Sequence, residues 1–175
     1  MKARDQSAFA EFAAGRAVAL HRAAYLLVGD QQLAQDLVQE ALIKTYVAWP
    51  RLRDPGNAEA YCRKAMTTTA ITWFRRKGWR NERPAETVPD LGHEYDDASA
   101  QRVTLWQALL ELPVRQRASL VLRFYEDLTE AQTADVMGCA VGTVKSQVSA
   151  ALRKLRDRLG DDVELLSPDE MVGAQ

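Results

Sequence analysis

The fold of this 175-residue chain is decided by residues 128–159, which read LTEAQTADVMGCAVGTVKSQVSAALRKLRDRL. Thr129 can cap a first helix, and Gln132, three residues later, completes a capping-box pattern. Gly138 stands where a helix ends in a left-handed residue, and a second helix is expected to begin near Val141. Two short helices around a tight turn predict a helix-turn-helix, the second helix of which enters the major groove of DNA. A helical hairpin inside some other all-α domain is the alternative interpretation.

The second helix of this motif has two chemically different faces. Apolar residues at helical spacing predict the face that packs on the rest of its domain: Val144, Val148, Ala151, Leu152, Leu155 and Leu159. The polar residues left facing outwards are candidate contacts to DNA: Thr143, Lys145, Ser146, Gln147, Ser149 and Arg153. Lysine, arginine and glutamine can address phosphates or base edges, whereas hydroxyl side chains more often bind the DNA backbone.

The rest of the chain also predicts helices, with no alternating strand and no internal repeat. We expect a first helix over residues 6–28, with Phe9, Phe12, Leu20, Ala24 and Leu27 among its core positions. Three more helical stretches are expected: from Asp30, as a cap, to about Trp49 before Pro50; over residues 57–77; and from about residue 101 to a pause at Pro113.

These segments predict an all-α protein with two small helical domains. The first domain is expected over residues 5–80 and the second, which contains the helix-turn-helix, over residues 101–160. Residues 81–100 hold glycine, proline and acidic residues without periodicity, which predicts a flexible acidic linker. Residues 161–175 form an acidic tail.

Several functional classes are excluded by composition. No apolar run approaches the roughly 20 residues that a membrane helix needs, and no secretory signal is recognisable, so we expect a cytoplasmic protein without a membrane segment. The two cysteines and two histidines are far apart, which indicates neither a metal site nor a disulfide framework. Paired carboxylates, nucleophile–base sets and phosphate loops are missing too, so we expect no enzyme, no catalytic residues and no cofactor.

Charge is distributed unevenly, although the net charge is only −1. Residues 51–84 carry nine basic and three acidic side chains, and residues 113–160 carry eight basic and five acidic ones. The segment between them and the tail are both acidic. Two basic segments with acidic connectors indicate two surfaces for nucleic acid.

A possible docking face lies on the helix expected after Asp30. Its inner side is apolar, and four residues at helical spacing share another side: Asp36, Gln39, Glu40 and Ile43. An ordinary solvated face would be polar as well. The pairing of acidic groups with an outward isoleucine favours instead the docking of a basic partner helix.

The helix expected over residues 57–77 interleaves basic and aromatic side chains. Candidate contacts to single-stranded DNA in it are Arg63, Lys64, Trp73, Arg75, Arg76 and Lys77. Unpaired strands need cations for their phosphates and aromatic faces for their bases, and each stacked base can contribute roughly 1–3 kcal/mol. The alternative interpretation is that Trp73 and Phe74 are ordinary core residues and that the basic run over residues 75–77 is a solubilising helix end.

Two segments resemble bacterial sigma factors. The core-polymerase-binding segment of these proteins is similar to residues 33–46, LAQDLVQEALIKTY, and their promoter-binding C-terminal domain is similar to residues 112–159. The short two-domain layout resembles the extracytoplasmic-function group of the sigma-70 family. Residues 60–77, AYCRKAMTTTAITWFRRK, further resemble an actinobacterial SigE-like branch of that group.

The resemblance implies an alternative sigma factor that binds core RNA polymerase, through the β′ clamp helices and the β flap, and directs promoter-specific initiation. It implies that Asp36, Gln39 and Glu40 contact the clamp helices. It also implies that the loop at residues 51–57 and four helix positions face the unpaired minus-ten strand: Arg63, Lys64, Thr67 and Thr68. The outward residues of the helix-turn-helix would then bind the minus-thirty-five element, and an anti-sigma factor would be a further partner.

Three positions depart from the pattern of the relatives. Thr68 stands where many have asparagine, Ala140 where many have serine, and Gln147 where many have arginine. Ala140 cannot cap its helix, at a cost of about 1 kcal/mol, and Gln147 removes a charge, so we expect weaker intrinsic promoter binding or a different minus-thirty-five sequence. Thr68 is expected to change the base preference at the minus-ten element. A stand-alone helix-turn-helix regulator is the competing function, but it leaves residues 1–80 without a role. The tail is explained by self-occlusion, by a further partner or by simple disorder.

Overall fold

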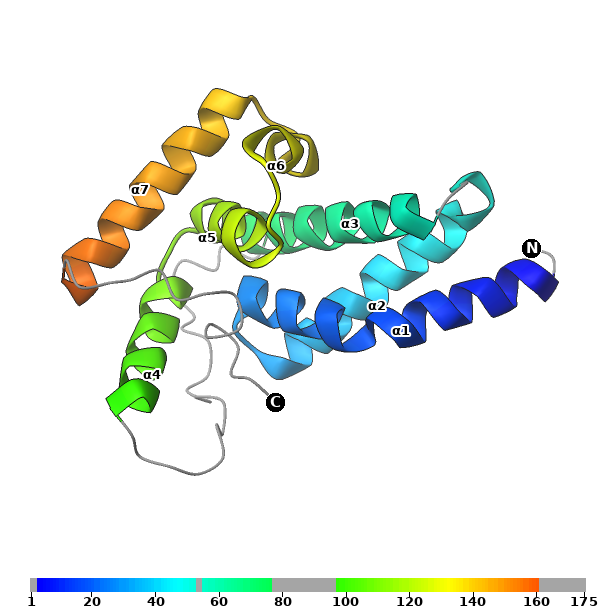
Figure 1. The fold of residues 1–175 in the computed structure, drawn as a ribbon, viewed down its shortest axis with the longest axis horizontal. Coiled ribbons are helices and arrows are strands. Elements are labelled where there is room, and N and C mark those ends of the chain that lie inside the picture. The colour runs from blue at the N-terminus through cyan, green and yellow to red at the C-terminus, as the bar shows by residue number, and fades with distance from the viewer. Residues whose placement is uncertain (1–2, 53–54, 77–96, 161–175) are drawn as a thin grey trace. The chain divides into compact units, whose positions relative to one another are not determined.

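A computed structural model describes residues 3–52, 55–76 and 97–160. These residues form helices and short connections and contain no strand, as the all-α prediction requires. The chain divides into two compact units, Met1–Gly78 and Trp79–Gln175. Figure 1 traces the helices of both units along the chain.

The first unit is built from three long helices. They are α1 (Ala3–Val28), α2 (Gln31–Ala48) and α3 (Pro55–Arg76), with a 3₁₀ turn over Trp49–Arg51. Gly29 adopts a left-handed φ of 76° between α1 and α2. The Asp30 carboxylate then accepts a hydrogen bond of 2.9 Å from the backbone N–H of Leu33, so the predicted cap of α2 is confirmed.

Helix α2 packs against both α1 and α3, which lie to either side of it in Figure 1. The C-terminal third of α1 is buried almost completely, and Leu37 and Ala41 of α2, which packs against α1, are fully buried. The N-terminal half of α1 is more exposed. There the predicted core residues Phe9 and Phe12 are half-buried and join Tyr46 and Trp49 in an aromatic cluster.

The second unit consists of shorter helices. They are α4 (Asp97–Leu110), α5 (Val114–Leu120), a π-helical segment (Val121–Tyr125), α6 (Glu130–Met137) and α7 (Val141–Leu159). The start of α4 at Asp97 corrects the prediction, because residues 97–100 were assigned to the linker. The predicted pause at Pro113 is confirmed, since Pro113 is the N-cap residue of α5.

The helix-turn-helix is formed by α6 and α7 as predicted. Thr129 Oγ1 accepts a hydrogen bond from the N–H of Gln132, whose side chain in turn accepts one from the N–H of Thr129. Gly138 ends α6 with a left-handed φ of 61°. Ala140 is the N-cap residue of α7 and has no side chain to bond the helix end. The cap of α6 and the turn that ends it could therefore be predicted from the residue types alone.

A buried charge lies at the centre of the second unit. Arg117 of α5 is only 2% exposed, and its guanidinium donates a 2.8 Å hydrogen bond to the carbonyl oxygen of Leu110. Burial lowers the pKa of Arg117 to about 10, because the charged form loses hydration. The hydrogen bond of Arg117 therefore links the end of α4 to α5.

Within the described parts of the chain, no helix combines the length and apolarity that a membrane crossing requires. Most of the predicted linker and the whole predicted tail, residues 161–175, fall outside the described residues.

Candidate protein-docking and nucleic-acid surfaces

The predicted docking residues come together on the outer side of α2. Asp36 and Gln39 are exposed, Glu40 is half-buried, and the apolar side chain of Ile43 is 64% exposed. Leu37 on the opposite side of the helix is fully buried. The combination of carboxylates with an exposed isoleucine suits a partner helix that is basic and partly apolar.

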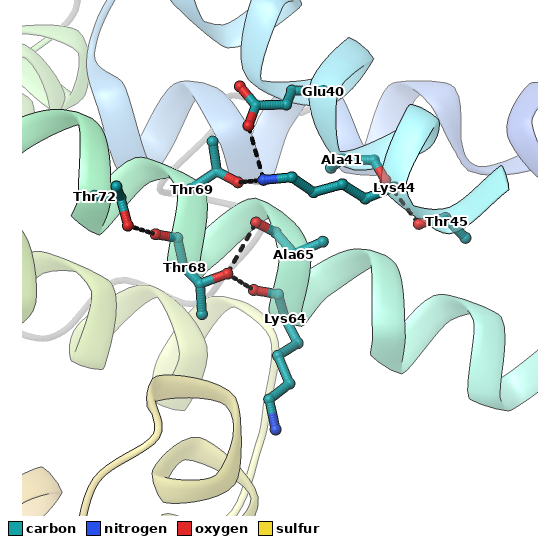
Figure 2. A network of polar contacts seen from close by, with 9 residues as sticks. All are labelled: Glu40, Ala41, Lys44, Thr45, Lys64, Ala65, Thr68, Thr69 and Thr72. Atoms are coloured by element: carbon teal, nitrogen blue, oxygen red, sulfur yellow. Dashed lines mark hydrogen bonds and ion pairs between the residues drawn. The ribbon is translucent and has the colours of Figure 1, made fainter. Parts of the chain in front are cut away.

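One carboxylate of this face belongs to a polar network that links α2 to α3 (Figure 2). Lys44 Nζ lies 2.7 Å from Glu40 Oε1 and 2.6 Å from Thr69 Oγ1. Thr69 is a buried residue of α3, with 4% of its surface exposed. Lys44 therefore joins the Glu40 carboxylate to a residue of the neighbouring helix.

A groove of about 490 Å³ adjoins the docking face, between α1 and α2. Its lining residues are Ala17, Val18, His21, Arg22, Gln35, Val38 and Gln39. Gln39 belongs to both the groove and the docking face, and Val18 is a large apolar side chain that is 65% exposed. The sequence analysis missed this contribution of α1, because the exposure of Val18 depends on how α1 and α2 pack and not on a local pattern.

Helix α3 presents most of the predicted minus-ten residues at its surface. Thr68 is exposed, and Arg63 and Lys64 are half-buried. Figure 2 shows the side chain of Lys64 extending away from α2. Thr67, in contrast, has no exposed surface, so its prediction as a contact to DNA is wrong in this conformation. Its side chain lies on the face of α3 that the packing of the first unit covers, which spacing along one helix does not reveal.

The hydroxyl of Thr68 is engaged within its own helix. It donates to the carbonyl oxygen of Lys64 at 2.8 Å and lies 3.2 Å from that of Ala65, while Thr72 donates to the Thr68 carbonyl at 2.8 Å. Back-bonding of this kind uses the donor of each hydroxyl and leaves lone pairs facing outwards.

The C-terminal end of α3 carries the exposed cations Arg75 and Arg76. Trp73 is half-buried, which is compatible with both the core and the base-stacking interpretation. Lys77 lies outside the described residues. Arg63, nearer the middle of the helix, is 3.4 Å from Glu59, which also pairs with Arg16 of α1 at 2.8 Å.

Helix α7 carries its predicted DNA-facing residues on one outer side. Lys145, Ser146, Ser149 and Arg153 are exposed. Thr143 and Gln147 are only half-buried, so they combine packing with access. Val144, Ala151 and Leu155 are buried, which confirms the core positions of the predicted inner face at these three sites.

Two cations of α7 form ion pairs with glutamates of the second unit. Lys145 lies 3.5 Å from Glu130, the first residue of α6, and both side chains are largely exposed, so solvent screens the pair. Arg158 pairs with Glu111. Lys154 and Arg156 are further exposed cations of α7 that the sequence analysis did not select. They continue the same basic run and were recognisable from it.

In the described residues, no cluster of three or more histidine, cysteine, aspartate or glutamate side chains is arranged to hold a metal ion.

Two family models match the chain. The model of Sigma-70 region 2 matches residues 16–80, and the model of Sigma-70 region 4 matches residues 102–155. The first match falls almost wholly within the first unit, and the second match falls within the second unit.

Curated relatives match most of their own length. The RNA polymerase sigma-E factor of Streptomyces avermitilis is 39% identical over 154 residues, which is 86% of this chain and 84% of that protein. The RNA polymerase sigma factor SigV of Bacillus subtilis is 31% identical over 139 residues, 79% of this chain and 83% of that protein.

Two solved structures share the fold. One is the sigma factor RpoE of Bartonella quintana in complex with the anti-sigma factor NepR, with a TM-score of 0.68, 24% identity, and coverage of 88% of this chain and 98% of that chain. The other is CnrH in complex with the cytosolic domain of CnrY, with a TM-score of 0.62, 21% identity and 90% coverage of both chains.

Proposed function

Since this chain belongs to the extracytoplasmic-function group of the sigma-70 family, it is an alternative sigma factor that directs transcription initiation, and we propose that its two units divide this task. The first unit binds core RNA polymerase and the minus-ten element, and the second binds the minus-thirty-five element. The family is in general not enzymatic, and the chain acts in the cytoplasm, where core polymerase is found.

Core polymerase is held by the outer side of α2. Asp36, Gln39 and Glu40 meet the β′ clamp helices, and Ile43 adds apolar contact area at the edge of the carboxylates. This face is the single observation that carries the proposal, because a stand-alone DNA-binding regulator has no use for it. The cap at Asp30 fixes where α2 begins and hence which residues its outer side presents.

The unpaired minus-ten strand runs along α3. Arg63, Lys64, Arg75 and Arg76 supply positive charge for its phosphates, Thr68 meets a base, and Trp73 offers part of an aromatic face. Lys77 extends this cationic end by its place in the sequence. Thr67 is left out of the proposed surface because it is fully buried.

The minus-thirty-five element is bound by α7 in the major groove of duplex DNA. Lys145, Gln147 and Arg153 are placed to meet base edges or phosphates, and Thr143, Ser146 and Ser149 to fix the register of the helix on the backbone. We assign contact with the β flap to this unit as well.

An anti-sigma factor is a further proposed partner. One solved structure of the same fold, RpoE of Bartonella quintana, is a sigma factor in complex with an anti-sigma factor. Occupation of the α2 face by a regulator would exclude core polymerase.

The proposal is tested by mixing the purified chain with core polymerase, transcribing genomic DNA and mapping the start sites. We expect a complex of chain and core enzyme, together with start sites that share two upstream elements. Binding of the chain to a palindromic site in the absence of polymerase, with no complex formed, would support the stand-alone regulator instead.

A further inference from the structure

Lys44 occupies an unusual place on the edge of the docking face of α2. It is a cation next to a surface that the proposed function pairs with a basic partner, and its own side chain is 44% exposed. Its ammonium group does not project freely, because it lies within hydrogen-bonding distance of both Glu40 and Thr69 (Figure 2).

The two contacts of Lys44 differ in what they can fix. The pair with Glu40 is an ordinary i,i+4 contact between half-exposed side chains, and such a pair alone restrains neither partner strongly. The 2.6 Å contact with Thr69 reaches another helix and a residue that is 4% exposed. Because Thr69 is held in the core, it anchors the ammonium group, which in turn anchors the Glu40 carboxylate.

We propose that Lys44 is a positioning residue that holds the Glu40 carboxylate in the orientation that core polymerase binds, with Thr69 of α3 as its anchor. This inference rests on the proposed function of the α2 face. It also couples the docking helix to the helix assigned to the minus-ten strand, since Thr68 directly precedes the anchor.

The proposal predicts an effect opposite in sign to simple charge repulsion. If Lys44 acted only through its charge, its removal would strengthen binding to a basic partner. If it positions Glu40, its removal weakens binding, because a freely rotating carboxylate must be ordered when the complex forms.

The test measures the dissociation constant of the full chain and core polymerase in the absence of DNA. We expect Lys44→Met to weaken binding about three- to tenfold. Thr69→Val removes the anchoring hydroxyl without changing any charge, and we expect a smaller loss in the same direction. Thr72→Val, a matched change on the same helix, is expected to bind as the wild-type chain does. Tighter or unchanged binding of Lys44→Met would overturn the proposal, and unchanged binding of Thr69→Val would reject Thr69 as the anchor.

Two further variants separate positioning from general damage to the fold. Lys44→Arg retains a donor that can reach both partners and is expected to restore most of the affinity. In a Glu40→Gln background, Lys44→Met is expected to cause little further loss, because its target has been neutralised. An equal additional loss in that background would show that Lys44 acts independently of Glu40 and would refute the proposal.

Failure of this inference is distinguishable from failure of the proposed function. If the wild-type chain binds core polymerase and Asp36→Arg weakens the complex while the two network variants do not, only the role of Lys44 is rejected. If the wild-type chain does not bind core polymerase at all, the proposed function is rejected with it.

Discussion

A single missing hydroxyl distinguishes the start of α7 from the start of α6. Thr129 caps α6 through a reciprocal pair of hydrogen bonds, whereas Ala140 begins α7 with extended backbone (φ −72°, ψ 151°) and no side-chain cap. The backbone at Ala140 already has the geometry that an N-cap serine adopts. The two helix starts therefore differ in side-chain chemistry and not in conformation.

We predict that Ala140→Ser stabilises the second unit by about 1 kcal/mol, because the new hydroxyl can accept a bond from the start of α7. Native-state hydrogen exchange of the α7 amides measures this without requiring two-state unfolding of the whole chain. Ala150→Ser places the same residue inside α7 and is expected to be neutral or slightly destabilising. Equal effects of the two substitutions would exclude capping as the cause.

The buried Arg117 predicts a dependence of stability on pH. Desolvation lowers its pKa from the ordinary value of an arginine to about 10 in the folded chain. The folded protein thus loses the proton first, and its stability rises as the pH increases through about 10, where the unfolded chain still holds the proton.

We predict that the wild-type chain gains stability relative to Arg117→Met between about pH 9 and about pH 11. Methionine has a side chain of similar length to arginine but no titratable group. The difference in the free energy of unfolding between the two proteins therefore cancels the titration of all the groups that they share. Measurement of α5 hydrogen exchange or urea unfolding at both pH values provides the difference. A constant difference across this range would show that Arg117 remains charged throughout.

At the scale of the element, α2 is a helix with one side committed to the core and another available to a partner. We predict that Asp36→Arg weakens binding to core polymerase about tenfold or more, because it reverses a charge opposite a basic surface. The measurement is a fluorescence titration with core enzyme. Glu11→Arg makes the same change at an exposed site of α1 and is expected to have little effect. Similar losses for both variants would indicate a nonspecific charge effect. Asp36 is a cleaner test than Glu40, because a change at Glu40 also releases Lys44.

Helix α7 is expected to read DNA without contributing to assembly with the polymerase. We predict that Lys145→Ala weakens binding of the holoenzyme to upstream promoter DNA. If Lys145 contacts a phosphate, the substitution also reduces the slope of log affinity against log salt concentration by about one. Gln147→Ala is expected to change the preferred base instead. Affinity for core polymerase is the control, and its loss in either variant would contradict the division between the units.

The ends of the helices could be predicted from the sequence, whereas the contacts between helices could not. The caps at Asp30 and Thr129 and the left-handed Gly138 were predictable, because each depends on residues within one turn of the helix end. The burial of Thr67 was not, because it depends on how α3 packs within the first unit. The hydrogen bond from Lys44 to Thr69 joins two helices across 25 residues of sequence, so no local pattern predicts it.

At the scale of the whole molecule, the chain joins two small helical units, each with a basic segment of its own. The net charge of −1 conceals this arrangement, and only the distribution of charge along the sequence indicated it. Residues 161–175 continue this uneven pattern with five acidic side chains and no basic ones. The division of labour that we propose assigns the docking face and one DNA-binding helix to the first unit and the second DNA-binding helix to the second unit.

The most direct test of this division is run-off transcription from a promoter mapped with this chain, comparing core polymerase alone, the chain alone and the two together. We predict a discrete transcript only when both are present, its loss with Asp36→Arg, and its reduction with Lys145→Ala despite normal core binding. A chain that neither binds core polymerase nor supports a transcript from any promoter would contradict the account.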